Sequence, residues 1–190
     1  ASQPVTQSLE GVVTEGKLHV GAADNSPALA TFDGTAGPWW SVGIAGLDVD
    51  SQGRELVSGT FPDFLAAFTQ TLPYCTDCET GMETVSGTSF ATPQAAGVAA
   101  SILLQTRTQL GHVGGIVAGA QGPVMVRGGG REISVWQLRR AMEQAAAQPA
   151  TTDYQPSSPT AIPVLPVLPA LQTGWGVLTP DSASGVVARG

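Results

Sequence analysis

The chain has 190 residues, which suffices for one domain with a substantial core and is too short for two ordinary domains. Hydrophobic residues make up 42% of it and charged residues 12%, so the composition predicts a folded protein. The formal net charge of −7 argues against a nucleic-acid partner, and no apolar stretch reaches the roughly 18 to 20 residues that span a bilayer. We therefore expect neither nucleic acid nor a membrane as a partner.

In the first half of the chain, apolar runs bounded by turn-forming residues predict two strands. The first strand covers residues 17–24 (KLHVGAAD) and the second covers residues 39–46 (WWSVGIAG). Residues 61–68 (FPDFLAAF) predict a short helix that begins at Pro62. Three of its apolar side chains would then share one face: Phe64, Leu65 and Phe68.

Two longer helices are expected in the second half. The first covers residues 89–105 and is rich in small apolar residues, with Pro93 in its first turn, where a missing amide hydrogen costs little. The second begins after Ser134, which forms a capping-box pattern with Gln137, and it ends before Pro149.

The remaining segments predict loops and turns. Residues 111–130 are rich in glycine and predict a β-hairpin or an extended loop, and residues 151–170 are rich in proline and predict a surface excursion. A polar loop at residues 75–82 contains Cys75 and Cys78. Two cysteines do not supply the four ligands of a structural zinc site, so we expect a local disulfide or a pair of free thiols.

Ser89 is the candidate nucleophile. It follows Gly87 and Thr88 at the start of the predicted helix, where free backbone amides and the helix dipole favour negative charge. A serine at this position also suits a simple N-cap, which the local pattern alone does not distinguish from a nucleophile. A serine hydroxyl becomes nucleophilic only when a base and donors for the oxyanion are within reach.

The longer motif favours the nucleophile. GTSFATPQAAG, from Gly87 to Gly97, resembles the serine signature of the subtilisin-like serine proteases, in which Gly-Thr-Ser precedes a proline and a helix of small residues. The resemblance covers nearly the whole chain: GPWWSVGIAG resembles the strand that leads to the family's Ala-Pro-Gly, and GWGVLTPDSA resembles its closing segment. Ala45 and Gly46 stand where the family has Ala-Pro-Gly, Phe90 where it often has Met, and Gln94 where it often has His.

The resemblance implies an α/β fold with a doubly wound parallel sheet, of which residues 1–190 would be the C-terminal part of one peptidase domain. It implies peptide hydrolysis through an acyl-enzyme on Ser89, with Gly87 and Thr88 supporting the oxyanion hole. No cofactor is required for this chemistry. Calcium often binds the family, but no carboxylate cluster in the sequence assigns a site.

The family's Asp-Thr-Gly-like and His-Gly-Thr-like segments are missing, and matching the strand at 17–24 puts the oxyanion asparagine ahead of Ala1. His19 lies within a predicted strand and His112 follows the nucleophile helix, so neither matches the family's base. We therefore expect an N-terminal chain of the same protease to supply Asp, His and Asn and to cover an open sheet edge. The present chain alone should then be nearly inert.

Two other classes of protein have features in common with the serine segment. The α/β-hydrolases place their acid between serine and histidine, and no Asp or Glu lies between Ser89 and His112. A non-catalytic module derived from the family, in which Ser89 only caps a helix, stays open. The N-terminal ASQPVTQSLEG lacks the pattern of a signal peptide, and we expect a secreted or extracellular protein whose leader is absent from this chain.

Overall fold

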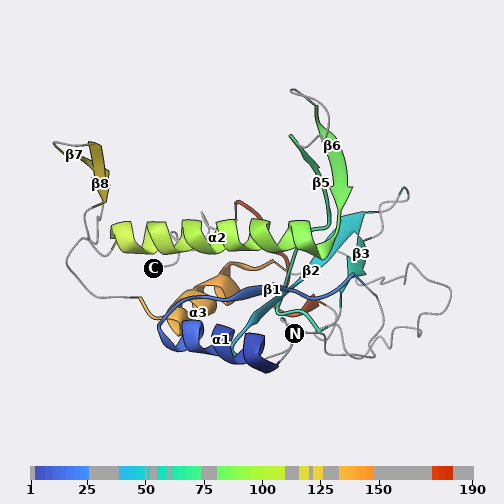
Figure 1. Ribbon diagram of the computed structural model, residues 1–190. Coiled ribbons are helices and arrows are strands. Elements are labelled where there is room, and N and C mark those ends of the chain that lie inside the picture. The colour runs from blue at the N-terminus through green and yellow to red at the C-terminus, as the bar shows by residue number, and fades with distance from the viewer. Residues whose placement is uncertain are drawn as a thin grey trace.

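We describe the fold from a computed structural model of the chain. The structure describes residues 3–25, 39–49, 51, 55–59, 61–73, 81–109, 116–119, 122–125, 133–147 and 173–181. Within these ranges the chain forms three helices and eight strands (Figure 1). No helix in them combines the length and the apolar composition needed to cross a membrane.

Three parallel strands form the centre of the molecule. The strand β2 (Val42–Val49) lies between β1 (Val20–Ala22) and β4 (Phe64–Ala67), and both neighbours run parallel to it. A fourth strand, β3 (Glu55–Ser58), pairs antiparallel with the end of β2. Among the described strands, β1 pairs only with β2, so its other edge is open.

Both strands predicted in the first half are confirmed, with shifted ends, but the helix predicted at residues 61–68 is wrong. Phe64, Leu65 and Ala66 lie in β4 and are all fully buried. A strand buried on both faces shows a continuous apolar run, and a short run of this kind does not distinguish helix from strand. Ala45 and Gly46, which the resemblance matched to a strand end, lie in the middle of β2.

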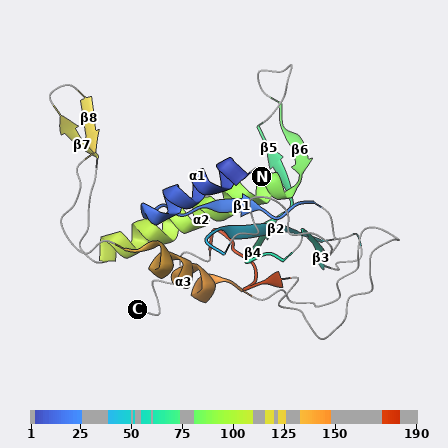
Figure 2. The ribbon, with the colours of Figure 1, turned by 60° about the horizontal axis from the view of Figure 1, so that its bottom comes forward.

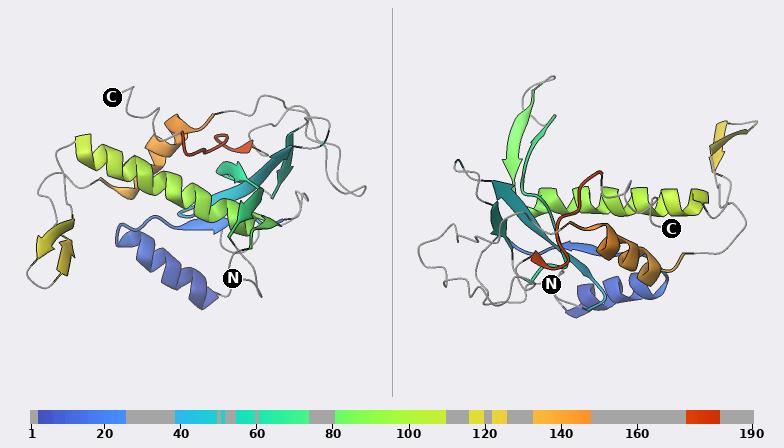
Figure 3. Two further views of the ribbon diagram at one scale, coloured as in Figure 1. Left: turned by 90° about the horizontal axis from the view of Figure 1, so that it is seen from above. Right: turned by 180° about the vertical axis from the view of Figure 1, so that it is seen from behind.

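The helix α2 (Thr88–Gln109) crosses one face of the parallel strands, as the view from above shows (Figure 3). Alternation along the strands turns Val42, Ile44, Phe64 and Ala66 to this face. They pack against small and branched residues of α2: Ala91, Ala95, Val98, Ala99 and Ile102. The small side chains allow the helix to lie close to the sheet, which is why this segment is rich in alanine.

The predicted helix at 89–105 is thus confirmed, but Pro93 is not in its first turn. It is the sixth residue of a helix that begins at Thr88. Because proline has no amide hydrogen, the carbonyl of Ser89 cannot receive the helical hydrogen bond from residue 93. The first turn of α2 therefore depends on other contacts.

The helix α3 (Val135–Ala145) packs against α2 through Leu138 and Met142. Its predicted capping box is confirmed: the side chain of Ser134 accepts from the amide of Gln137, whose side chain accepts from the amide of Ser134. The helix α1 (Gln3–Thr14) was not predicted from the sequence and has no buried residue. In the view from above, α1 and α3 lie on opposite sides of α2 (Figure 3).

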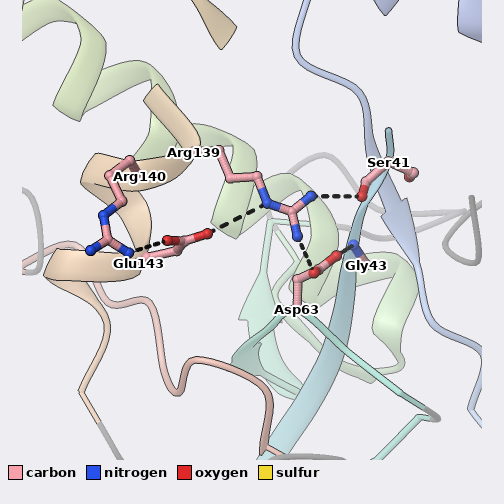
Figure 4. A network of polar contacts seen from close by, with 6 residues as sticks. All are labelled: Ser41, Gly43, Asp63, Arg139, Arg140 and Glu143. Atoms are coloured by element: carbon pink, nitrogen blue, oxygen red, sulfur yellow. Dashed lines mark hydrogen bonds and ion pairs between the residues drawn. The ribbon is translucent and has the colours of Figure 1, made fainter. Parts of the chain in front are cut away.

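An ion-pair network attaches α3 to the sheet (Figure 4). Arg139 donates to a carboxylate oxygen of Asp63 and to the carbonyl of Ser41, and its Nε lies 3.6 Å from Glu143. The other oxygen of Asp63 accepts from the amide of Gly43 at 2.7 Å. One arginine thus joins α3 to β2 and to the start of β4.

Two antiparallel hairpins stand at opposite ends of α2 (Figures 1 and 2). One pairs β5 (Thr69–Leu72) with β6 (Glu83–Ser86), and β6 leads directly into α2. The other pairs β7 (Ile116–Gly119) with β8 (Gly122–Met125), which confirms the predicted hairpin between residues 111 and 130. The β5–β6 pairing was not predicted, and the cysteines and the proline-rich segment lie outside the described residues.

Candidate active site

Ser89 is the second residue of α2 and is exposed, whereas Thr88 beside it is only 2% exposed. Gly87 connects β6 to the helix with φ +149°, a backbone angle that side-chain-bearing residues rarely adopt. This sharp strand-to-helix connection turns the Thr88 side chain into the protein and leaves the Ser89 side chain facing solvent. No hydrogen bond joins the Ser89 hydroxyl to another described residue.

The backbone around Ser89 is fixed from the strand side. The amide of Gly87 donates to the carbonyl of Phe68 at 3.0 Å. The hydroxyls of Ser86 and Thr69 lie 2.8 Å apart, and Thr69 also donates to Asp48 at 2.7 Å. Strands β2, β5 and β6 therefore hold the residues that lead into the nucleophile.

Asn25 completes the anchoring from the carboxyl end of β1. Its side-chain oxygen accepts from both the amide of Thr88, at 2.8 Å, and the hydroxyl of Thr88, at 2.9 Å. A backbone amide only donates, so the atom that faces it must be the oxygen of the Asn25 side chain. Nδ2 lies on the other side of the same amide group, and Asn25 is exposed.

The preceding residue shapes this turn. Asp24 has φ +67°, a left-handed conformation that Asp tolerates better than most residues, and its carboxylate accepts from the amide of Asn25 at 2.6 Å. The chain therefore leaves β1 abruptly, and the Asn25 side chain lies at the start of α2. Strained backbone of this kind is frequent at functional sites.

Most backbone amides at the start of α2 already donate to a described residue. The amide of Thr88 is bound to Asn25, and the amides of Phe90 and Ala91 both donate to the carbonyl of Gly87, at 3.0 and 3.2 Å. The amide of Ser89 donates to no other described residue. Among the described residues, Ser89 N and Asn25 Nδ2 are therefore left without an acceptor, and the helix dipole is positive at this end of α2.

His19 is not near this site. It immediately precedes β1, whereas Asn25 follows the strand, so the two residues lie at opposite ends of β1, and the four steps from His19 to Ala23 alone span about 13 Å. Its Nδ1 lies 2.7 Å from the hydroxyl of Ser41, and its ring contacts Trp40 edge to face. Burial lowers the pKa of His19. Its contacts with Ser41 and Trp40 give it a structural role away from Ser89.

The other candidate residues lie outside the described ranges: His112, Cys75 and Cys78. Within those ranges, no group of three or more His, Cys, Asp or Glu side chains is placed to hold a metal ion. The expectations about the cysteines and about calcium therefore stay predictions.

The fold and the serine motif define a subtilisin-like peptidase domain, and comparison with known families agrees. The model of the subtilase family matches residues 2–153, so the chain belongs to the subtilase family. No curated protein sequence matches the chain.

Several solved structures are similar in fold. Fervidolysin from Fervidobacterium pennivorans, a keratinolytic enzyme related to subtilisin, has a TM-score of 0.62 and 18% identity over 96% of this chain and 24% of its own. The prenylagaramide maturation protease PagA has a TM-score of 0.61 and 17% identity over 98% of this chain and 56% of its own. The self-cleaved protease domain of PatA has a TM-score of 0.57 and 20% identity over 100% of this chain and 57% of its own. The chain thus spans little more than half of the PagA and PatA structures.

The sequence analysis did not single out Asn25, because it matched the strand at residues 17–24 to a family strand that follows the oxyanion asparagine. A usable signal was the polar residue that directly follows a buried strand, because functional side chains gather at the carboxyl ends of parallel strands.

Proposed function

We propose that this chain is the serine-bearing part of a peptidase that hydrolyses peptide bonds through an acyl-enzyme on Ser89. One observation carries the proposal: Ser89 is exposed at the start of α2, next to a Thr88 held by the Asn25 oxygen, and neither the Ser89 amide nor Asn25 Nδ2 donates to another described residue. A substrate carbonyl attacked by Ser89 develops negative charge on its oxygen. Donors that are already in position stabilise this charge without reorganising, which is a large part of catalysis in acyl transfer.

Each step has a defined role for this chain. Ser89 Oγ forms a bond to the carbonyl carbon while a base removes its proton, and the oxyanion binds Ser89 N and Asn25 Nδ2. Collapse of the intermediate breaks the peptide C–N bond, and the base returns the proton to the leaving amine. Water then attacks the ester on Ser89 in the same way and releases the acid.

We propose Asn25 in place of the asparagine expected ahead of Ala1. Its position is supported by the two hydrogen bonds from Thr88, which fix the amide plane. Thr88 thus acts as the support of the oxyanion hole and Gly87 as the turn that allows it.

We further propose that an N-terminal chain of the same protease supplies the His base and the Asp that orients it. The only described histidine, His19, lies at the far end of β1 and is held by Ser41. One of the structures of similar fold is of a self-cleaved protease domain, so cleavage has a precedent on this fold.

Peptide hydrolysis by three preparations tests the proposal: the complete protease, the present chain alone, and the complete protease with Ser89→Ala. Loss of a member of such a triad typically costs on the order of 10⁶ in turnover. We expect activity only in the first preparation. Full activity of the chain alone, or of the Ser89→Ala protease, would contradict it; an inactive complete protease would favour a non-catalytic module.

A further inference from the structure

Two glutamine side chains occupy the edge of β4 next to the nucleophile. Leu65 on this edge exchanges hydrogen bonds with the C-terminal segment, through Gly176 and Leu178. Beyond that point no described strand continues the pairing. At Ala67 the two glutamine side chains bond to the backbone where a neighbouring strand would. Gln94 Oε1 accepts from the Ala67 amide at 2.9 Å, and Gln70 Nε2 donates to the Ala67 carbonyl at 3.0 Å.

Gln70 makes a second contact that Gln94 does not. Its Nε2 also donates to the carbonyl of Phe90, the residue after Ser89, at 2.8 Å. Both partners are carbonyl oxygens, so the atom between them must be a donor, which identifies it as the nitrogen. Gln70 therefore joins the last residue of β4 to the first turn of α2.

The first turn of α2 lacks one regular contact, because Pro93 removes the hydrogen bond that the Ser89 carbonyl would receive in a regular helix. At the start of the turn, the amides of Phe90 and Ala91 donate to the carbonyl of Gly87, and the Thr92 hydroxyl donates to the Thr88 carbonyl at 2.7 Å. These bonds fix Ser89 relative to its own loop, whereas the Gln70 bond fixes the next peptide relative to the sheet.

We propose that Gln70 is a positioning residue for Ser89, resting on the proposed function. By holding the carbonyl of Phe90, it ties the peptide between Phe90 and Ala91, one residue beyond Ser89, to the sheet, and this limits movement of the turn that carries the serine hydroxyl and amide. A displacement of the nucleophile well below 1 Å is enough to slow acyl transfer. The contribution of Gln70 is therefore kinetic as well as structural.

The test uses the complete protease with Gln70→Met, which keeps the shape of the side chain but donates no hydrogen bond. Its reaction with a fluorophosphonate is followed at several probe concentrations to separate the maximal rate of labelling from reversible probe affinity. We expect the maximal rate to fall roughly tenfold, the effect of one lost hydrogen bond at the nucleophile, with affinity unchanged. The thermal midpoint is measured on the same samples.

Two further variants make the outcome specific. Gln70→Lys keeps a donor of similar reach, and we expect it to label within about threefold of the original rate. Gln70→Asn keeps the amide but is one methylene too short to reach both carbonyls, and it should behave like Gln70→Met. If Gln70→Met does not fold, Gln70→Asn tests the same hydrogen bond. Thr71→Val is the matched control, because it removes a hairpin hydrogen bond to Thr84, 3.1 Å long, that does not reach α2.

Unchanged labelling in Gln70→Met or Gln70→Asn, with only a lower thermal midpoint, would overturn the inference, as would slow labelling in Gln70→Lys. Failure of the positioning role can be distinguished from failure of the proposed function. If the unaltered protease labels at Ser89 and the Gln70 variants label equally fast, only the positioning role fails. If the unaltered protease does not label at Ser89, the proposed function fails first.

Discussion

At the scale of single residues, the site depends on how a few polar atoms are shared between β1 and α2. Asn25 uses its oxygen to hold Thr88. In the proposed mechanism its nitrogen binds the oxyanion together with the Ser89 amide, so that anchoring and oxyanion binding are divided between the two ends of one amide group. This division predicts how substitutions of Asn25 differ.

Asn25→Asp separates the two roles, because the carboxylate still accepts from Thr88 but donates nothing and adds negative charge beside the oxyanion. In the complete protease we expect kcat to fall by roughly 10²–10³, the usual loss when one oxyanion donor is removed. KM should change little. Steady-state kinetics on a peptide substrate measures both values.

Asn25→Ala removes the anchor as well as the donor and serves as the comparison. Asn25→Asp should be at least as slow as Asn25→Ala. If Asn25→Asp instead kept the original kcat, Asn25 would only be an anchor for Thr88, and the second oxyanion donor would have to come from elsewhere.

At the scale of elements, the sequence predicted what is local and missed what depends on neighbours. The capping box of α3 and the small-residue helix α2 are encoded by residues three or four positions apart, and both are confirmed. The strand β4 was mistaken for a helix because its identity comes from pairing with β2, which lies far away in the sequence. The strands β5 and β6 also depend on their pairing partner, and residues 74–80 lie between them in the sequence.

The attachment of α3 gives a prediction at this scale. Arg139 is 17% exposed and bonds to Asp63 and to the carbonyl of Ser41. Its neighbour Arg140 is 63% exposed and, among the described residues, forms an ion pair only with Glu143. Arg139→Met leaves the partly buried Asp63 without its cation. We expect a loss of about 2–4 kcal/mol in the free energy of unfolding, somewhat below the cost for a fully buried pair.

Arg140→Met is the matched control and should change the free energy of unfolding by less than about 0.5 kcal/mol, because exposed ion pairs contribute little. Urea unfolding of the two variants in the complete protease compares them directly. Equal losses would mean that the network in Figure 4 does not attach α3 to the sheet.

At the scale of the whole molecule, the described sheet ends at β1. The amide of Ala23 donates to Ile44 and the carbonyl of His19 accepts from Val42, so the backbone of these two residues faces β2. Because backbone groups alternate along a strand, those of Val20 and Ala22 face the open edge. An open edge of this kind is ready to pair with another strand.

The proposed N-terminal chain would pair with this edge. We therefore expect the amides of Val20 and Ala22 to exchange hydrogen more slowly in the complete protease than in the present chain alone, whereas the amide of Ala23 is protected in both. Hydrogen exchange with residue resolution measures the difference. Equal exchange of Val20 and Ala22 in both preparations would place the N-terminal chain elsewhere.

The parts of the proposed site differ in how far the sequence predicts them. The serine motif GTSFATP predicted the candidate nucleophile because its residues are contiguous, whereas Asn25 was added only by the structure, because β1 brings it to the helix. The proposed base lies on another chain, so no local pattern in these residues predicts it.

The central claim is that Ser89 is an activated nucleophile, and labelling with a fluorophosphonate followed by peptide mass spectrometry tests it most directly. In the complete protease we predict one adduct, on the peptide that contains Ser89, and none after Ser89→Ala or on the present chain alone. A complete protease that hydrolyses peptides but carries its adduct on a different residue, or a protease that forms no adduct, would contradict the claim.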